Sequence, residues 1–377
     1  MTIQFIDLQR QYQRIENALW ERLSKVLKSC KFILGPEVAE LETKLSEFVG
    51  RKYCVSCSSG TDALLMPLMA WGIGSGDAVF TSPFTFIATS EVIRLVGATP
   101  VFVDIDPRTF NIDPAELERN IVEVISQGKL KPKAIIPVDL FGLPANYEKI
   151  LDIAKKYNLL VLEDAAQGFG GMWNGKYACS FGNASATSFF PAKPLGCYGD
   201  GGAVFTDDPE LYELLLSIRV HGQGANKYEN VRNGINGRLD TLQAVVLLTK
   251  LELFPEELKL RNEVAQKYCT LLKGKVETPF VPEGYTSSWA QFSVLAKDET
   301  ERKRIIEKLN EKGIPTAIYY PKPLHLQKVN LDLGYKEGDF PVSESIAKRI
   351  FSLPMHPYLK DAEIEMISST IIEALNL

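Results

Sequence analysis

The sequence predicts an α/β protein with a mostly parallel central sheet flanked by helices, followed by a smaller α+β domain. Between about residues 50 and 205, short apolar runs typical of buried strands alternate with stretches of helical periodicity. Such alternation favours βα units, in which helices cover both faces of a parallel sheet. The length of 377 residues exceeds what one small core requires and favours a second domain.

Five strands and four helices are expected in the first part. The strands are Tyr53–Ser58, Ala78–Ser82, Pro100–Asp104, Ala134–Asp139 and Leu159–Asp164. The helices are Thr61–Trp71, Phe86–Leu95, Pro114–Ile125 and Tyr147–Tyr157.

The pattern changes after residue 209. A helix at Pro209–Val220 and a loop rich in Gly and Asn should precede a helix at Leu239–Leu253, which Pro255 is expected to end before a second helix, Glu256–Leu272. Beyond these we expect strands at Trp289–Leu295 and Thr316–Tyr320 and helices at Glu299–Lys312 and Asp361–Ala374. We place a large domain, with an N-terminal helical segment, at residues 1–250 and a small α+β domain at residues 251–377.

Composition argues against several classes of partner. The 42 basic and 47 acidic residues give a formal charge of −5, without a basic block, so neither nucleic acid nor an anionic membrane is an expected partner. The N-terminal residues lack the apolar core of a signal peptide, and no run approaches the roughly 20 apolar residues of a membrane span. We therefore expect a cytoplasmic protein.

The six cysteines do not predict a disulfide framework or a metal site. Cys54-Val-Ser-Cys57 has the spacing of a zinc or redox pair, but no second pair accompanies it and no histidine is nearby. We interpret both cysteines as strand residues and expect no metal.

Lys193 is the first candidate catalytic residue. It lies in Ser188-Phe-Phe-Pro-Ala-Lys193-Pro-Leu-Gly, between two prolines and before a glycine-rich run. Because the following proline disfavours helix, the lysine should sit on a stiff loop, where partial burial would lower its pKa and favour a nucleophilic amine. The alternative is a solvated loop lysine.

Asp164 is the second candidate, at the end of the apolar run Leu159-Leu-Val-Leu-Glu-Asp164. In parallel α/β sheets, ligands bind beyond the carboxyl ends of strands, where this carboxylate would stand. Pyridoxal phosphate (PLP) chemistry needs such a carboxylate to keep the pyridine nitrogen protonated. A helix cap is the alternative for Asp164.

The segment Cys57-Ser-Ser-Gly60-Thr61-Asp62 should follow a strand and open a helix, where backbone N–H groups and the helix dipole favour an anion such as a cofactor phosphate. Small residues in a βα turn are a weak indication by themselves. Phe86 could stack on the cofactor ring, or it could be a buried core residue.

Together these motifs resemble the PLP-dependent enzymes of fold type I, the aspartate aminotransferase fold. More closely, the chain resembles the sugar aminotransferase family named after DegT and StrS, from Phe5-Ile-Asp-Leu and Phe32-Ile-Leu-Gly-Pro-Glu to Ser352-Leu-Pro-Met-His-Pro. The resemblance implies an enzyme that uses PLP, L-glutamate as the amino donor and a nucleotide-linked keto sugar as the acceptor. It also implies a homodimer.

The resemblance further implies a role for each matching residue. Lys193 would bond to the cofactor and later move a proton, Asp164 would pair with the pyridine nitrogen, and Gln167 would contact the ring hydroxyl. The phosphate would be held by Gly60, Thr61 and Ser188 and the ring covered by Phe86. Asn236, in Gly234-Ile-Asn236-Gly-Arg238, would reach the phosphate of the partner subunit, so that each active site is composite.

Within the family, the chain is most similar to the branch that aminates carbon 3 of UDP-3-keto-N-acetylglucosaminuronate for bacterial surface polysaccharide such as O-antigen. By this likeness Arg238 would bind the uronate carboxylate, since its planar fork suits bidentate binding. A cap of the following helix is the alternative for Arg238.

Three departures from that branch put the uronate in doubt. A His-Tyr-Pro motif is here Tyr319-Tyr320-Pro321, a Ser before the lysine is Ala192, and a Tyr near the N-terminus is Phe32. Phe32, Tyr319 and Tyr320 remain candidate substrate contacts, and neutral UDP-3-keto-N-acetylglucosamine or a dTDP-3-keto-6-deoxyhexose are alternative substrates. Lys193 argues against a sugar dehydratase of the same fold, which has His there, and no segment is left over for the DNA-binding module of a regulator.

Overall fold

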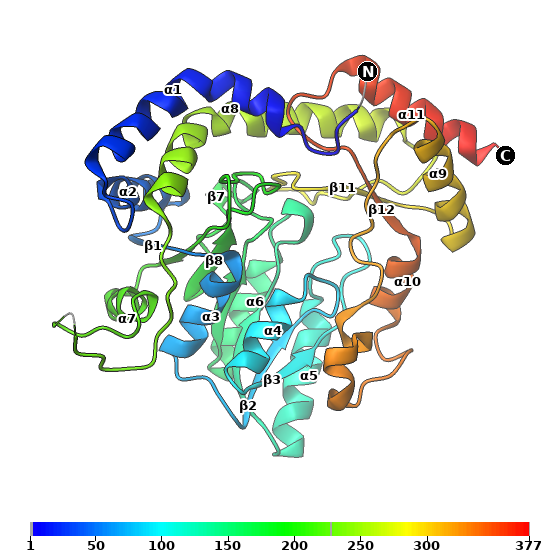
Figure 1. The fold of residues 1–377 in the computed structure, drawn as a ribbon. Coiled ribbons are helices and arrows are strands. Elements are labelled where there is room, and N and C mark those ends of the chain that lie inside the picture. Colours follow the sequence, from blue (N-terminus) through cyan, green and yellow to red (C-terminus); the bar gives the residue numbers. More distant parts are fainter. Residues whose placement is uncertain (1–2, 227, 377) are drawn as a thin grey trace.

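The computed structural model describes residues 3–226 and 228–376 and confirms the predicted α/β class (Figure 1). A seven-stranded sheet has the order β1-β9-β8-β5-β4-β2-β3. Within this sheet β9 runs antiparallel to both of its neighbours, and the remaining strands are parallel to one another. The strands are β1 Tyr53–Cys57, β2 Asp77–Thr81, β3 Thr99–Phe102, β4 Lys131–Ile136, β5 Leu160–Asp164, β8 Ala184–Ser188 and β9 Gly202–Thr206.

Helices cover both faces of this sheet, because successive side chains of a strand point to opposite faces. On one face, Val79 and Val204 belong to the core shared with α3, Gly60–Ala70, α4, Ala88–Leu95, and α7, Pro209–Arg219. On the other face, Phe80 and Ile135 pack in a core with α5, Pro114–Gln127, and α6, Tyr147–Tyr157. Helix α2, Pro36–Val49, packs with α8 and with the β1–β9 side of the sheet in a third core.

The parallel direction of β1, β8 and β5 brings their carboxyl ends to one edge of the sheet. Strand β9 begins at the same edge, since Gly202 pairs with both Cys57 and Ser188. The sequence patterns did not indicate β8 and β9, yet these two strands hold both ends of the loop that carries Lys193.

The prediction that Pro255 separates two helices is wrong. Helix α8 is continuous from Thr241 to Leu271 with Pro255 inside it, and Figure 1 shows that it bends rather than stops. The helix continues because residues on both sides of the proline, such as Phe254 and Arg261, are buried against other elements. Tertiary packing therefore outweighs the local cost of proline.

The C-terminal part has its own core, in which Val264 and Tyr268 of α8 pack against Phe292, Ile305 and Ile367. The prediction of a strand at residues 316–320 is wrong, because that segment forms only one isolated bridge, between Ala317 and Ser352. The remaining elements are α1 Leu8–Ser29, β6 Met172–Trp173, β7 Lys176–Tyr177, β10 Tyr285–Thr286, β11 Phe292–Leu295, α9 Glu299–Glu311, α10 Pro341–Arg349, β12 Ile350–Leu353, α11 Asp361–Leu375 and three short 3-10 helices, η1 Leu140–Gly142, η2 Leu324–Leu326 and η3 Lys328–Leu333. The expected domain boundary at residue 250 falls inside α8 and stays a prediction.

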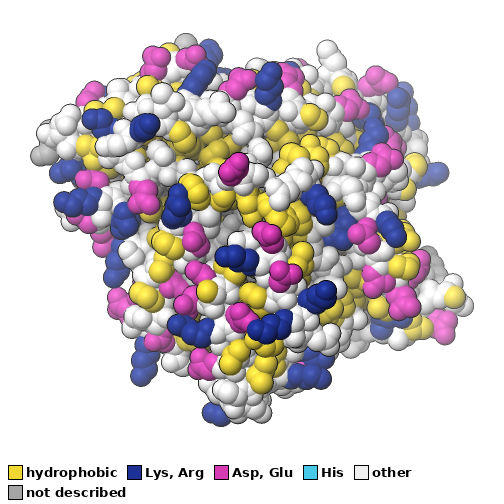
Figure 2. Space-filling view, turned by 180° about the vertical axis from the view of Figure 1, so that it is seen from behind, with side chains coloured by type: hydrophobic (Ala, Val, Ile, Leu, Met, Phe, Trp, Pro, Cys, Tyr) yellow, Lys and Arg dark blue, Asp and Glu magenta, His cyan; other side chains and the backbone are white. Residues whose placement is uncertain are grey.

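Charged side chains of both signs are interspersed over the face shown in Figure 2. Among the described residues, no helix is both long enough and apolar enough to cross a membrane.

Candidate active site

Lys193 lies in the loop between β8 and β9, at the edge of the sheet where β5 ends. Its backbone N–H donates to the carbonyl of Phe190 at 2.8 Å. Burial lowers the pKa of the Lys193 amine, and the nearby Asp164 carboxylate opposes that shift. An amine with a lowered pKa is neutral, and therefore nucleophilic, over a wider range of pH.

Asp164 ends β5 and is almost fully buried. Its Oδ2 accepts a hydrogen bond from Thr89 Oγ1 at 2.8 Å, and its Oδ1 accepts one from Ala166 N at 3.2 Å. Burial raises the pKa of Asp164, whereas the bonds from Thr89 and Ala166 and the charge of Lys193 lower it. The helix-cap alternative is wrong, because turns follow Asp164 and no helix begins there. The carboxylate is thus held in one orientation near an amine.

Gln167 connects the turn after β5 to the segment around Tyr320. Its Oε1 accepts the backbone N–H of Phe141 at 2.6 Å, and its Nε2 donates to the Tyr320 hydroxyl oxygen at 3.0 Å. Burial raises the pKa of Tyr320, so this hydroxyl keeps its proton at neutral pH. The structure therefore brings together two predicted site residues that lie 153 positions apart.

Phe86 is exposed over 55% of its surface, so the alternative that it is a buried core residue is wrong. Its ring centroid lies 6.5 Å from that of Tyr320, whose ring is in turn 5.8 Å from that of Tyr319. Tyr320 also accepts the hydrogen bond from Gln167, so this group of aromatic residues adjoins the turn that carries Gln167. An exposed ring at this place is free to stack on a planar ligand.

Gly60, Thr61 and Ser188 converge from the ends of β1 and β8. A Cβ atom on Gly60 would lie only 2.6 Å from Ser188 Cβ, so this approach requires glycine. Gly60 begins α3, whose N-cap Ser59 accepts the backbone N–H of Asp62 at 3.1 Å. The helix N-terminus and the hydroxyls beside it can bind an anion.

Phe32 and Arg238 lie on segments that pack against each other at the start of α8. The backbone N–H of Thr241 donates to the Phe32 carbonyl at 3.0 Å, and Ile33 forms a bridge with Asp240. Phe32 is 40% exposed and Ile33 55% exposed, which leaves apolar surface beside this segment.

Arg238 is half-buried, and its Nε has no hydrogen-bond partner. No acidic side chain pairs with it anywhere in residues 3–226 and 228–376. Asp240, and not Arg238, occupies the N-cap position of α8, so the helix-cap alternative is wrong. Asn236 is exposed and forms no side-chain hydrogen bond within the same described ranges. The next residue, Gly237, accepts the backbone N–H of Ser58 at 3.0 Å, which anchors this segment beside the start of α3.

Comparison with known proteins identifies the family. Residues 13–372 match the model of the DegT/DnrJ/EryC1/StrS aminotransferase family. The chain belongs to this family. A protein of Pseudomonas aeruginosa named UDP-2-acetamido-2-deoxy-3-oxo-D-glucuronate aminotransferase is 47% identical over 98% of this chain and 99% of its own length.

Solved structures agree with this membership. A DegT DnrJ EryC1 StrS aminotransferase from Brucella abortus has a TM-score of 0.95 and 51% identity, covering 98% of this chain and 99% of that one. NtdA of Bacillus subtilis with bound cofactor PMP, the amino form of PLP, has a TM-score of 0.89 and 30% identity, covering 99% of this chain and 83% of that one. The prediction of a PLP-dependent aminotransferase is confirmed.

The site residues of this aminotransferase fit PLP. A Cβ atom on Gly60 would collide with Ser188, so the glycine keeps the start of α3 beside the Ser188 hydroxyl, where backbone N–H groups and hydroxyls can hold a phosphate. Lys193 supplies an amine, and Asp164 supplies an oriented carboxylate for a pyridinium nitrogen. The individual roles of these residues stay predictions.

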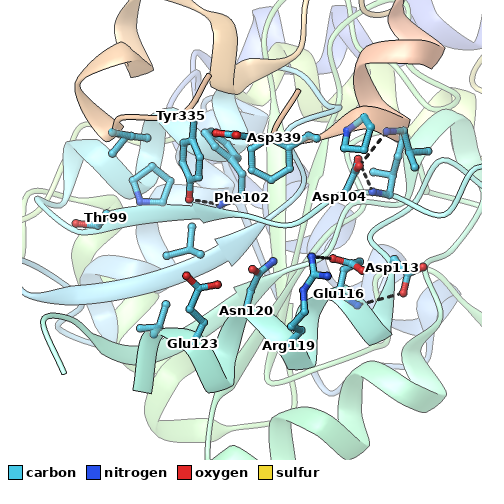
Figure 3. A pocket seen from close by; sticks show the side chains of 18 of the residues that line it. Thr99, Phe102, Asp104, Asp113, Glu116, Arg119, Asn120, Glu123, Tyr335 and Asp339 are labelled. Atoms are coloured by element: carbon cyan, nitrogen blue, oxygen red, sulfur yellow. Dashed lines mark hydrogen bonds and ion pairs between the residues drawn. The ribbon is translucent and has the colours of Figure 1, made fainter. Parts of the chain in front are cut away.

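A separate cavity of about 830 Å³ lies between β3, α5 and residues 333–342, and none of the predicted site residues lines it (Figure 3). Several of its polar groups are already paired. The Tyr335 hydroxyl accepts the backbone N–H of Phe102 at 3.3 Å, and Asp104 accepts the N–H groups of Val342 and Ser343. Strand β3 is an edge strand, and Pro100 within it has no backbone N–H that another strand could bond. The contacts made by Tyr335, Val342 and Ser343 cover the same edge, which protects the sheet from pairing with another strand.

Sequence patterns did not identify Thr89 and Phe141, which orient Asp164 and Gln167. The contacts span 75 and 26 residues, so no local motif reveals them. Thr89 lies in the first turn of α4 and Thr85 lies four residues earlier, before that helix begins, and their Oγ1 atoms are 3.3 Å apart.

Proposed function

We propose that this aminotransferase moves the amino group of L-glutamate to carbon 3 of UDP-3-keto-N-acetylglucosaminuronate, for a bacterial surface polysaccharide. The observation that carries the proposal is Arg238, a half-buried guanidinium without an acidic partner in the described chain. An unpaired fork of N–H donors suits the carboxylate of a uronate. The glucuronate in the name of the 47% identical relative supports the same substrate.

The alternative is a neutral UDP-3-keto-N-acetylglucosamine or a dTDP-3-keto-6-deoxyhexose. It is favoured by three apolar or altered residues, Phe32, Ala192 and Tyr319, where the uronate branch has polar groups. Phe32 in particular presents an exposed ring that offers no hydrogen bond.

Bound PLP supplies an electron sink that stabilises negative charge on the carbon next to the transferred nitrogen. Asp164, oriented by Thr89, holds the proton at the pyridine nitrogen. With the cofactor bound, Lys193 Nζ, whose pKa is lowered by burial, would take the proton from that carbon and return it to the carbon on the other side of the transferred nitrogen. Gln167 orients the ring hydroxyl, and Phe86 covers the ring. Gly60, Thr61 and Ser188 anchor the phosphate.

We infer that the active unit is a homodimer with composite sites. Asn236 has no side-chain partner in its own described chain and is exposed, and Phe32 and Ile33 leave apolar surface near it. A second subunit would cover this surface and receive Asn236 at its cofactor phosphate.

The test is a substrate panel with purified enzyme and L-glutamate. It would contain 3-keto and 4-keto UDP- and dTDP-sugars, each as a uronate and a neutral form where both exist, with formation of 2-oxoglutarate as the measurement. We expect the highest kcat/KM for the UDP-3-keto uronate. A preference for a neutral sugar would overturn the uronate, and a preference for a 4-keto sugar would overturn the carbon 3 assignment.

A further inference from the structure

Two carboxyl groups, those of Asp139 and Glu163, lie within hydrogen-bonding reach of each other next to the proposed cofactor site. Asp139 follows and Glu163 precedes the two residues of the parallel bridge Val138–Asp164, so both side chains point to the same face. Both side chains are fully buried, and neither forms an ion pair with any residue that the structure describes. Glu163 immediately precedes Asp164 on β5, so its side chain points to the opposite face of the sheet. The titratable side chains of neighbouring segments that interact with the pair are hydroxyl and thiol groups, those of Tyr147, Cys179 and Tyr285, and the negative charge of the pair raises the pKa of each.

Glu163 has the hydrogen bonds of a carboxylate anion. Its Oε1 accepts the backbone N–H of Cys179 at 2.6 Å, and its Oε2 accepts Phe181 N–H at 2.8 Å and the Ser185 hydroxyl at 2.7 Å. The two backbone N–H groups can only donate, whereas the Ser185 hydroxyl also lies 2.9 Å from the Phe181 carbonyl and has one proton for the two acceptors. A proton on Glu163 Oε1 would face the Cys179 N–H, and a proton on Oε2 could be accepted by Ser185, but neither would give Asp139 Oδ2 a donor.

Asp139 has the hydrogen bonds of a neutral acid. Its Oδ1 accepts Ala145 N–H at 3.0 Å and the Tyr147 hydroxyl at 2.7 Å. Its Oδ2 is buried, and no described group donates to it. A buried carboxylate oxygen without a donor is costly, but a protonated oxygen there could itself donate to Glu163.

We propose that Asp139 carries a proton on Oδ2 and donates it in a hydrogen bond to Glu163, and that this acid–carboxylate pair positions Asp164 and Gln167. Sharing one proton removes the repulsion between two buried charges and gives the unpaired oxygen a partner. Burial raises the pKa of both groups. The charge of Glu163 and the hydrogen bond to it raise the pKa of Asp139 further, whereas the hydrogen bond from Asp139 lowers that of Glu163.

Asp139 contacts the proposed site directly at two points, and its neighbour Phe141 contacts it at a third. The backbone N–H of Asp139 donates to the Asp164 carbonyl at 3.0 Å. A Cβ atom on Gly168 would lie 2.6 Å from Asp139 Oδ2, so the turn after Asp164 rests directly on this side chain. Two residues after Asp139, the N–H of Phe141 holds Gln167 Oε1. Asp139 and Glu163 are therefore positioning residues, an inference that rests on the proposed roles of Asp164 and Gln167.

The first test compares Asp139→Asn with Glu163→Gln in the full-length enzyme. An amide at residue 139 can still donate to Glu163 and accept from Tyr147, so cofactor affinity and kcat should stay within about twofold of wild type. An amide at residue 163 would turn N–H groups toward Cys179 N–H or Phe181 N–H, so stability and cofactor affinity should fall. The reverse order, with Glu163→Gln tolerated and Asp139→Asn not, would place the proton on Glu163 and overturn the assignment.

The second test detects the proton on Asp139 from the pH dependence of stability, without measuring enzyme activity. Above the ordinary pKa of Asp, the unfolded wild-type chain loses a proton that the folded protein keeps on Asp139. The free energy of unfolding of the wild type therefore falls as the pH rises. The Asp139→Asn variant has no such proton, so it lacks this pH dependence. The ratio of the unfolding constants of wild type and variant, from urea titrations of the cofactor-free chain, should rise about tenfold per pH unit between pH 5 and the raised pKa. Asp208→Asn, at an exposed cap of α7, is the matched loss of one carboxylate. A ratio for Asp139→Asn that does not change with pH would refute the shared proton, whatever the enzyme's substrate.

The third test measures whether Asp139 positions Asp164 and Gln167, and its measurement is kcat. Asp139→Ala should lower kcat about tenfold with little change in the KM for the sugar, and Asp139→Asn should restore it. If Asp139→Ala keeps the wild-type kcat, the pair is structural only and the positioning role is wrong.

Discussion

Thr89 Oγ1 donates a hydrogen bond of 2.8 Å to Asp164 Oδ2, although the two residues are 75 positions apart. Thr89 lies in the first turn of α4 and Asp164 at the end of β5, so the bond joins two elements that flank the proposed cofactor site. A neutral donor inside a buried site favours the charged form of the carboxyl group. Thr89 therefore sets both the direction and the charge of the carboxylate that we assign to the pyridine nitrogen.

Thr89→Val should weaken catalysis while leaving the fold intact, because valine has the same shape but no hydroxyl. Hydrogen bonds to charged groups contribute about 1.5–3 kcal/mol, which corresponds to a roughly ten- to hundredfold fall in kcat. The pKa of Asp164 should rise further, so the activity lost on acidification should be lost at a higher pH than in wild type. Steady-state pH profiles check both effects, and Thr89→Ser is the control that should retain the bond.

The parallel part of the fold was predictable because its strands are short apolar runs with clear helical stretches between them. Asp77–Thr81 and Tyr147–Tyr157, for example, lie within one residue of the predicted ranges. Strand β8 was not predicted, since Ala184–Ser188 is made of Ala, Ser and Thr and lacks the apolar pattern. Strand β9, Gly202–Thr206, is apolar but was not recognised directly after a glycine-rich run. The segment 316–320 is rich in the β-branched and aromatic residues that favour strands, but its Tyr320 packs against Phe84 and Phe86 instead of continuing a ladder.

Candidate site residues could be proposed from the sequence where chemistry and chain position coincide, as for Asp164 at a strand end and Lys193 between prolines. The residues that support them could not be found in this way. Thr89, Phe141 and Asp139 act through contacts made by folding, and each looks like an ordinary loop or helix residue in the sequence. Composition likewise says nothing about which of two buried carboxyl groups holds a proton.

Lys193→Ala should fold and lose transamination, because it shortens a loop side chain and removes the only amine that we assign to proton transfer. Borohydride reduction of the wild type should attach the cofactor to a peptide that contains Lys193, as peptide mapping by mass spectrometry would show. Label on another lysine would contradict the assignment. Since burial lowers the pKa of Lys193, the wild-type rate should rise with pH up to that lowered pKa and then level off.

Asp164→Asn should bind the cofactor better than it turns over substrate. The amide can still accept from Thr89 and Ala166, but it has no charge to hold a proton on the pyridine nitrogen. Cofactor Kd from fluorescence titration and kcat from the coupled glutamate assay separate the two effects. Turnover close to that of wild type would show that Asp164 has no electrostatic role.

Arg238→Ala should discriminate between uronate and neutral sugars. Losing a charge-assisted hydrogen bond costs about 1.5–3 kcal/mol, so kcat/KM should fall roughly ten- to hundredfold for the uronate and much less for its neutral counterpart. Arg238→Lys keeps the charge without the planar fork and should be intermediate. Equal losses on both sugars would mean that Arg238 does not bind a carboxylate.

The last prediction tests whether the active site is shared between subunits. Lys193→Ala is defective in the amine but keeps Asn236 and Arg238, whereas an Asn236→Ala/Arg238→Ala variant keeps the amine. In a mixed dimer, the proposed composite site that combines Lys193 of one chain with Asn236 and Arg238 of the other is intact, and the second site carries both defects. Mixing the two inactive proteins under conditions that exchange subunits should therefore regenerate activity, measured on heterodimers purified with two different affinity tags. The opposite arrangement, in which Asn236 binds the phosphate of its own chain, also has structural support. The Gly237 carbonyl accepts a hydrogen bond from Ser58 N–H of the same chain, beside the start of α3. If Asn236 served the phosphate of its own chain, each site in a heterodimer would contain a defect from one chain or the other, and verified heterodimers would stay inactive.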